Sequence, residues 1–292
     1  MGTPRPPAKR AAAAVSTAGP AGQASLRSVA HRFAGACGRG VSDIHVLGVR
    51  YDDDDHKIGD TLVVRMRPGR LEAVTAMSGP ARCIACLGKE VVVVDDGGAL
   101  RTLDGRVLLE GVVDLCDQRT RLLALTEGGA VVDVVTGQEL VRVPGARCIN
   151  GGVVVAAESV TGLDGRRLHE GVVDVATAAA GRLAWSKGRS LVVDGRPFML
   201  SHPAHALCFA FGACFVGSTV SGLSVVDEAG LRGLRPSLRA HGLAHADDGL
   251  IVIADLMLAT SDDGADFISR DLAAYVRLAE KQGDRRDKHA AQ

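Results

Sequence analysis

The stretch Leu103-Asp-Gly-Arg-Val-Leu-Leu-Glu-Gly-Val-Val-Asp-Leu115 recurs 60 residues later as Leu163-Asp-Gly-Arg-Arg-Leu-His-Glu-Gly-Val-Val-Asp-Val175, with 10 of 13 residues identical. Asp-Gly is a typical tight-hairpin sequence, because glycine adopts positive φ without steric cost and aspartate tolerates it. In both copies the turn is followed by a short strand, a glycine and an apolar run. An internal repeat of this kind predicts an array of similar structural units.

The repeat extends to seven units when each unit is anchored on the small residue that opens an apolar strand. Successive anchors lie 25 to 41 residues apart. The anchors are Gly40, Ala81, Gly111, Ala146, Gly171, Ala204 and Ala240.

Each unit contains further strands in a constant order. The second strand is the most apolar, as in Val91–Val94 and Val153–Ala156, and such runs suit strands buried on both faces. A third strand leads into a glycine turn, and a more polar fourth strand leads to the next anchor. Four short strands in each of seven units predict an all-β fold, a seven-bladed β-propeller with four-stranded blades.

Three parts of the chain follow from this pattern. We predict a disordered Ala/Pro-rich basic tail over residues 1–24, the propeller over 25–269 and a helix and tail over 270–292. Residues 29–36 precede the first anchor, and we expect them to supply the fourth strand of the seventh blade and so close the ring. Ile268, Leu272 and Val276 share a helical face in the run 268–282, which predicts a C-terminal α-helix.

Composition limits the function and the compartment. The formal net charge is zero and aromatic residues make up 3% of the chain, which argues against direct nucleic-acid binding. The uncharged run 197–226 is long enough to span a bilayer, but its glycines and proline favour buried strands over a membrane span. The odd number of cysteines, seven, predicts reduced thiols in an intracellular compartment, the cytoplasm or nucleus. The basic character of residues 1–40 also fits an organellar targeting signal.

Several stretches resemble known propeller repeats. Gly129-Ala-Val-Val-Asp-Val-Val-Thr-Gly-Gln-Glu-Leu140 is similar to quinoprotein-like (YVTN-type) blades, and Leu258-Ala-Thr-Ser-Asp-Asp-Gly264 resembles the inner hairpin of a WD40 repeat. His205 and His241 resemble the histidine of the Gly-His motif in such repeats, whereas the Trp-Asp dipeptide of WD40 repeats does not occur. The resemblance implies a seven-bladed scaffold that binds proteins, and it carries over no catalytic residue.

The anchors also predict a set of residues at the mouth of a central channel. Side chains alternate along a strand, so the second and fourth positions of each anchor motif share a face. One interpretation is a charged channel mouth that binds a polar or acidic partner segment. The alternative is that the aspartates pair with Arg82 and Arg147 of neighbouring blades and fix the strand register. The predicted partner-binding residues are Asp43, Arg82, Asp114, Arg147, Asp174, His205 and His241.

Chemistry-bearing motifs are sparse. Cys83 and Cys86 form a CxxC without the second pair that a zinc site needs, and on a strand their offset sends the sulfurs to opposite faces. Histidines from adjacent blades, at positions 202, 205, 241 and 245, offer a second arrangement in which zinc ligands would cluster. The sequence contains no nucleophile elbow or phosphate loop. We therefore predict no cofactor, no metal and no catalytic residue.

The resulting hypothesis is a WD40-like interaction scaffold, a subunit or adaptor of an intracellular multiprotein complex that binds protein partners. The alternative function is a metal-dependent propeller hydrolase or lyase with its site at the channel mouth, because propeller enzymes need no linear motif.

Overall fold

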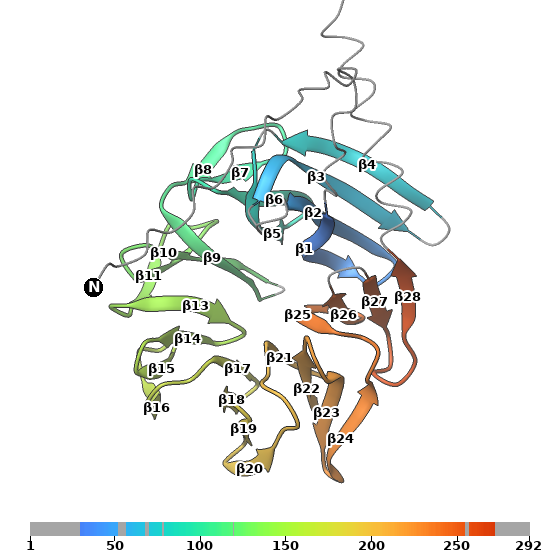
Figure 1. Cartoon of the computed structure of the whole chain (residues 1–292). Helices are drawn as coiled ribbons and strands as arrows, with labels where there is room; N and C mark the ends of the chain where they lie inside the picture. The colour runs from blue at the N-terminus through green and yellow to red at the C-terminus, as the bar shows by residue number, and fades with distance from the viewer. Residues whose placement is uncertain are drawn as a thin grey trace, which may run out of the picture.

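The computed structural model describes residues 30–51, 57–67, 70–77, 79–118, 120–254 and 257–271. Over these residues the chain forms 28 strands in seven four-stranded antiparallel sheets, and each sheet follows chain order. Figure 1 shows the sheets arranged as blades around a common axis, with the first strand of each blade innermost. The predicted all-β, seven-bladed propeller is confirmed.

The first four blades are built from consecutive strands. They comprise blade 1 with β1 (Ala30–Gly40), β2 (Asp43–Tyr51), β3 (Lys57–Arg67) and β4 (Arg70–Met77); blade 2 with β5 (Ala81–Leu87), β6 (Glu90–Asp95), β7 (Leu100–Thr102) and β8 (Val107–Leu109); blade 3 with β9 (Val112–Asp117), β10 (Leu122–Thr126), β11 (Ala130–Asp133) and β12 (Glu139–Arg142); and blade 4 with β13 (Ala146–Asn150), β14 (Val153–Ala156), β15 (Ser159–Gly162) and β16 (Arg167–Glu170).

The remaining blades follow the same plan. They comprise blade 5 with β17 (Val175–Ala179), β18 (Arg182–Lys187), β19 (Ser190–Val193) and β20 (Arg196–Met199); blade 6 with β21 (Ala206–Ala210), β22 (Ala213–Ser218), β23 (Gly222–Asp227) and β24 (Gly230–Arg235); and blade 7 with β25 (Ala240–Ala246), β26 (Gly249–Ala254), β27 (Met257–Ser261) and β28 (Ile268–Asp271).

The repeated Asp-Gly stretches form the turns that the sequence predicts. Gly105 has φ +93° and donates to the Thr102 carbonyl at 3.0 Å, and Gly165 has φ +80° and donates to the Gly162 carbonyl at 3.0 Å. Both turns join the third and fourth strands of their blades, β7 to β8 and β15 to β16. The glycine is required because a positive φ strains any residue with a Cβ.

The core lies between the blades. Seven clusters of buried apolar side chains occur, one for each pair of adjacent blades. The second strands supply the most completely buried residues, since β6, β10, β14, β22 and β26 each contain at least four consecutive buried residues. Valine, leucine and isoleucine therefore fill the spaces between sheets that aromatic side chains would otherwise occupy.

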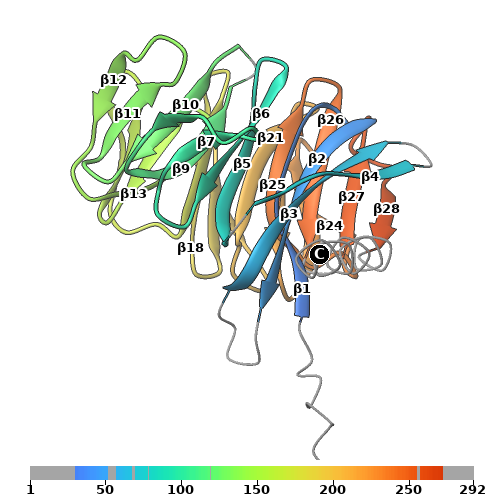
Figure 2. The same ribbon diagram turned by 90° about the horizontal axis from the view of Figure 1, so that it is seen from above.

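The ring closes without a borrowed strand, so the predicted role of residues 29–36 is wrong. β1 pairs with β2 as the innermost strand of blade 1, and β28 supplies the fourth strand of blade 7. Closure instead depends on packing of blade 7 against blade 1, where Ile44 and Val46 meet Ile251 and Leu258. Figure 2 shows the blue strands of blade 1 directly beside the red strands of blade 7.

The predictions for the two ends of the chain are partly wrong and partly outside the described residues. Residues 268–271 form β28, so the helix predicted over 268–282 is wrong for its first turn. The rest of that helix and the predicted tail over residues 1–24 lie outside the described residues. The uncharged run 197–226 folds as the strands β20 to β23. In the part of the chain that the structure describes, no helix has the length and apolar character needed to cross a membrane.

Candidate functional site

Six of the seven predicted channel-mouth residues lie on or next to an innermost strand. Arg82, Asp114, Arg147 and His241 lie on first strands, whereas Asp174 and His205 come just before β17 and β21. The predicted place of Asp43 on an innermost strand is wrong, because this residue opens β2, the second strand of blade 1. The anchor at Gly40 marks the end of β1 rather than its beginning, which shifts the predicted positions of blade 1 by a whole strand.

Asp43 forms an ion pair inside its own blade. Its carboxylate accepts from Arg65 Nε at 2.7 Å, and Arg67 Nε approaches to 3.4 Å. The hydrogen bond from Arg65 lowers the pKa of Asp43. Asp43 is 39% and Arg65 33% exposed at the side chain, so the pair is partly solvated and contributes modestly to stability.

Asp114 is the most buried of the predicted carboxylates. Its two oxygens accept from the backbone amides of Ile149 at 3.0 Å and Leu115 at 2.9 Å, and the Cys83 thiol lies 3.7 Å away. Burial raises the pKa of Asp114. The carboxylate therefore connects the innermost strands of blades 2, 3 and 4 through backbone and thiol donors.

The two predicted arginines bind backbone carbonyls. Arg82 pairs with Asp96 in the turn after β6, with Nε 3.3 Å from the carboxylate, and it also donates to the Asp96 carbonyl. Arg147 of blade 4 donates to the Val173 carbonyl at 2.7 Å, in the loop that enters blade 5. Asp174 accepts from the Gly188 amide at 2.6 Å.

The predicted Asp–Arg pairing between blades is therefore wrong. Among the described residues, Asp43, Asp114 and Asp174 form no ion pair with Arg82 or Arg147. The physical reason is that the turns and loops of the propeller present backbone amides and carbonyls closer to these side chains than the neighbouring charges are.

The cysteine and histidine predictions have different outcomes. Cys83 contacts Asp114 while Cys86 contacts Cys37, so the two sulfurs of the CxxC do point to different partners, as expected for a strand. Within the described ranges, no three His, Cys, Asp or Glu side chains are grouped so that they could hold a metal ion, and the four predicted histidines do not form such a group. His205 is exposed and lies near Thr219, whose hydroxyl is 3.3 Å from Nε2.

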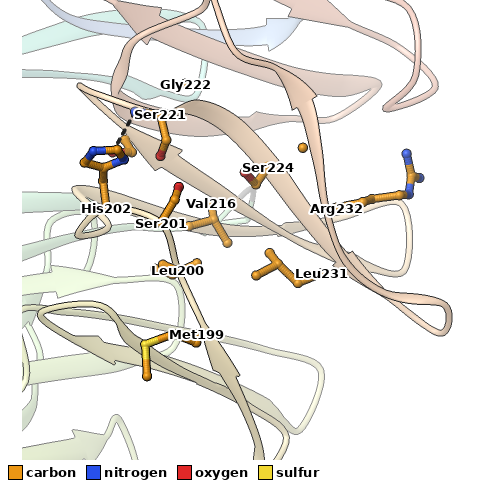
Figure 3. Close-up of a pocket in the computed structure, with 12 residues that line it drawn as sticks. Met199, Leu200, Ser201, His202, Val216, Ser221, Gly222, Ser224, Leu231 and Arg232 are labelled. Carbon is orange, nitrogen blue, oxygen red and sulfur yellow. Dashed lines mark hydrogen bonds between the residues drawn. The ribbon is translucent and has the colours of Figure 1, made fainter.

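A groove between blades 5 and 6 is the clearest concave surface of the described residues. Its volume is about 330 Å³, at the lower end of ligand-binding pockets. Figure 3 shows side chains from the end of β20, the following loop, β22, β23 and β24 around it. The lining residues are Met199, Leu200, Ser201, His202, Val216, Ser218, Ser221, Gly222, Ser224, Leu231, Arg232 and Gly233.

The groove has an apolar floor and a hydroxyl-rich wall. Leu200 and Val216 are buried at its base, whereas Met199 is 69% exposed at its edge. Ser218 is buried and accepts from the Ser221 amide at 3.4 Å, which holds the turn between β22 and β23. Val220, at the tip of that turn, is 55% exposed. Met199 is therefore an exposed apolar side chain of the groove, and the exposed Val220 belongs to the same turn as the lining residue Ser221.

Small residues leave the groove open. Gly222 has φ +79°, and a Cβ there would overlap the carbonyls of Arg235 and Pro236, so larger side chains are excluded from this wall. Gly233 faces open space.

Two exposed arginines follow the groove's last lining segment, residues 231–233, in the sequence. No Asp or Glu occurs between Pro197 and Val226. Arg235 and Arg239, on the chain that leaves β24, are exposed, and among the described residues neither forms an ion pair; His202 is exposed in the loop after β20. Arg232 is neutralised by Asp227 at 3.0 Å. The surface therefore offers apolar contacts beside cationic groups.

The groove was missed from sequence because its walls come from three separate segments of blades 5 and 6. The sequence feature that coincides with the groove is the uncharged run 197–226, whose length and glycines indicate buried strands but not a groove. His205 lies on the same stretch of chain, and it was predicted for a different reason, its position beside an anchor.

The fold defines the class of the protein as a seven-bladed β-propeller. Among solved structures, the computationally designed Ika8 protein is similar, with a TM-score of 0.52 and 14% identity over 82% of this chain and 87% of that one. Sqt1 of Saccharomyces cerevisiae is also similar, with a TM-score of 0.52 and 11% identity over 83% of this chain and 86% of that one. At these identities the likeness concerns the fold alone. No protein-family model matches the sequence, and no curated protein matches it.

Proposed function

We propose that this chain is a WD40-like protein-interaction scaffold, an adaptor or subunit of an intracellular complex, and that it binds an extended partner segment in the groove between blades 5 and 6. The observation that carries the proposal is a formed groove with an exposed apolar side chain, Met199, in its lining, next to a turn whose Val220 is also exposed. Exposed apolar residues beside a concavity are typical of interaction sites, and methionine is enriched at them.

The charge around the groove selects the partner. Arg235, Arg239 and His202 would favour carboxylates, and no acidic side chain of the run 197–226 opposes them. The floor formed by Leu200 and Val216 would take an apolar side chain. The partner segment is therefore an apolar anchor residue flanked by Asp or Glu, bound in extended form, with serine hydroxyls available to its backbone.

A peptide selection tests this directly. Purified full-length protein would be presented to a random peptide library, and selected peptides would be measured by fluorescence anisotropy. We expect selected sequences to contain a large apolar residue within a few positions of Asp or Glu. Selection of basic peptides, or of none, would contradict the proposal.

Matched variants locate the site. Met199→Ser should weaken binding about tenfold, which corresponds to about 1.4 kcal/mol, whereas Val135→Ser changes a side chain of the same 69% exposure on blade 3 and should have no effect. Arg235→Glu should weaken binding and reduce its salt dependence, whereas Arg121→Glu on blade 3 serves as the charge control. Equal losses in the Met199 and Val135 variants would remove the groove as the site.

The complex is tested with the same variants. Protein partners recovered with the wild-type chain from its native source should be lost with Met199→Ser and retained with Val135→Ser. A partner that remains bound to both variants uses another surface, and the propeller would then be a scaffold through a different face.

A further inference from the structure

The cysteines are concentrated around the propeller axis. Six of the seven lie on innermost strands, and Cys214 lies on β22. Small side chains suit these strands because the blades converge at the axis, and buried cysteine packs as a small apolar residue. The six are Cys37 on β1, Cys83 and Cys86 on β5, Cys116 on β9, Cys148 on β13 and Cys208 on β21.

One pair differs from the others by direct contact between sulfurs. The Cys86 thiol donates to Cys37 Sγ at 3.2 Å, although 49 residues separate them in the chain. They come from different blades, and β1 and β5 approach closely here, since a Cβ on Gly35 would lie only 3.2 Å from the Ile84 side chain. Both sulfurs belong to the apolar cluster between blades 1 and 2.

We propose that Cys37 and Cys86 form a reversible oxidative modification site, in which a peroxide converts the two thiols into a disulfide that joins blade 1 to blade 2. The proposal is independent of the partner groove. It rests on the contact between two sulfurs that the fold brings together from separate blades, and the only reagent it requires is a hydroperoxide.

The reaction proceeds in two balanced steps. The Cys86 thiolate attacks one oxygen of hydrogen peroxide, which breaks the O–O bond, forms a sulfenic acid and releases hydroxide. The Cys37 sulfur then attacks the Cys86 sulfur, and the sulfenic oxygen leaves as water with the Cys37 proton. Overall, two thiols lose two electrons to one peroxide, and two waters form.

Burial assigns the two roles. Cys37 is only 6% exposed, and its pKa is raised well above its ordinary value by the hydrogen bond with Cys86 and then by burial. Cys86 is partly exposed, so it is the sulfur that a peroxide reaches first. Because nucleophilic attack requires a thiolate, Cys37 acts second, as the resolving thiol, and the reaction should accelerate as pH rises.

The disulfide would constrain the ring. It would close a loop of about 50 residues that contains β2, β3 and β4 of blade 1, which reduces the entropy of the unfolded chain. For a domain of this size the melting temperature should rise by about 8 °C on oxidation. A reducing thiol should reverse the change.

The experiment uses the full-length protein in its folded state. Reduced protein would be treated with hydrogen peroxide, blocked with an alkylating reagent and mapped by peptide mass spectrometry without reduction, alongside melting curves. We expect a Cys37–Cys86 crosslink, loss of two of the seven thiols and the rise in melting temperature. The variants Cys37→Ala and Cys86→Ala should lack the crosslink and the rise, whereas Cys148→Ala, on the equivalent strand of blade 4, should show both.

Three outcomes would overturn the proposal. They are retention of all seven thiols in folded wild-type protein at peroxide concentrations that oxidise them in urea, a crosslink joining any other cysteines, and a disulfide that leaves the melting temperature unchanged. If Cys37→Ala fails to fold, Cys86→Ala still decides the matter, because Cys86 is partly exposed and its loss leaves a smaller cavity. In that variant a remaining rise would refute the assignment.

Discussion

Substitution of Gly151 by alanine should destabilise the propeller through the junction of blades 4 and 5. Gly151 has φ +58° and forms an isolated parallel bridge with Ala178 of β17. A Cβ at this position would overlap the Ala178 carbonyl oxygen and lie 3.0 Å from Thr177 Oγ1. The same carbonyl accepts from the Gly152 amide at 2.9 Å, so making room for the methyl group would break that hydrogen bond.

The magnitude follows from two contributions. The left-handed backbone conformation costs a residue with a Cβ about 1 kcal/mol. Loss of the hydrogen bond between Gly152 and Ala178 costs about 2 kcal/mol, since a partly buried donor is left without its acceptor. The variant Gly151→Ala should therefore lose about 3 kcal/mol of unfolding free energy.

Gly188→Ala provides the matched control. Gly188 has φ +54°, close to that of Gly151, but a Cβ there would meet no atom within 4 Å. This variant should lose only the conformational part, about 1 kcal/mol. Urea unfolding can be followed by the fluorescence of Trp185, the only tryptophan, which lies on β18 beside the altered junction. Equal losses in the two variants would refute the argument that close approach of the backbones requires glycine at position 151.

Two further substitutions test other contacts. Asp114→Asn should flatten the dependence of stability on pH. Burial places the folded pKa of Asp114 above its unfolded value near 4, so the wild type loses stability as pH rises from about 4 through the folded pKa. Melting curves recorded from pH 4 to 7 should show this slope only in the wild type. Asp248→Ala should cost about 1 kcal/mol in urea unfolding, because its carboxylate accepts from the Val41 amide at 2.7 Å and joins blade 7 to blade 1, whereas Asp248→Asn keeps an acceptor and should cost less. A flat wild-type profile, or equal effects of the two Asp248 variants, would contradict these assignments.

The sequence predicted those features that are local in the chain. The Asp-Gly turns at Gly105 and Gly165 depend on hydrogen bonds between residues three apart, so the turn residues alone are enough to predict them. The buried second strands were also predictable, because runs such as Val91–Val94 have no polar face to present to solvent. Counting these units was sufficient to establish seven blades.

The strand at which the first blade begins could not be predicted from the sequence in the same way. Blade 1 departs from the repeat, since β1 has 11 residues where the first strand of blade 2, β5, has 7, and β3 has 11 where the third strand of blade 2, β7, has 3. It also lacks the Asp-Gly turn, so the sequence pattern does not distinguish its first strand from the last strand of another blade. At the other end, β28 has only four residues, and a run that short cannot be distinguished from a helix by periodicity.

Backbone contacts explain why the interactions of the predicted channel-mouth residues could not be obtained from the sequence. The sequence placed polar residues near the axis, but it could not reveal what they bind. Arg147 reaches the Val173 carbonyl and Asp114 the Ile149 amide of the following blade, whereas Asp174 accepts from the Gly188 amide of its own blade, and all three partners are backbone groups. Backbone partners carry no sequence signature, so these polar side chains resemble a free binding surface until the fold is known.

The hydrogen bonds that these polar side chains already form also affect where a partner could bind. A side chain already bonded to the backbone of a neighbouring blade has to give up that bond before it can bind a partner, and the exchange yields little net affinity. The surface between blades 5 and 6 carries no such penalty at Met199, Val220 and the exposed Arg235, because these side chains project into solvent. The same physical rule that assigns Arg147 and Asp114 to holding the ring together therefore supports placing the proposed partner-binding site in the groove rather than at the axis.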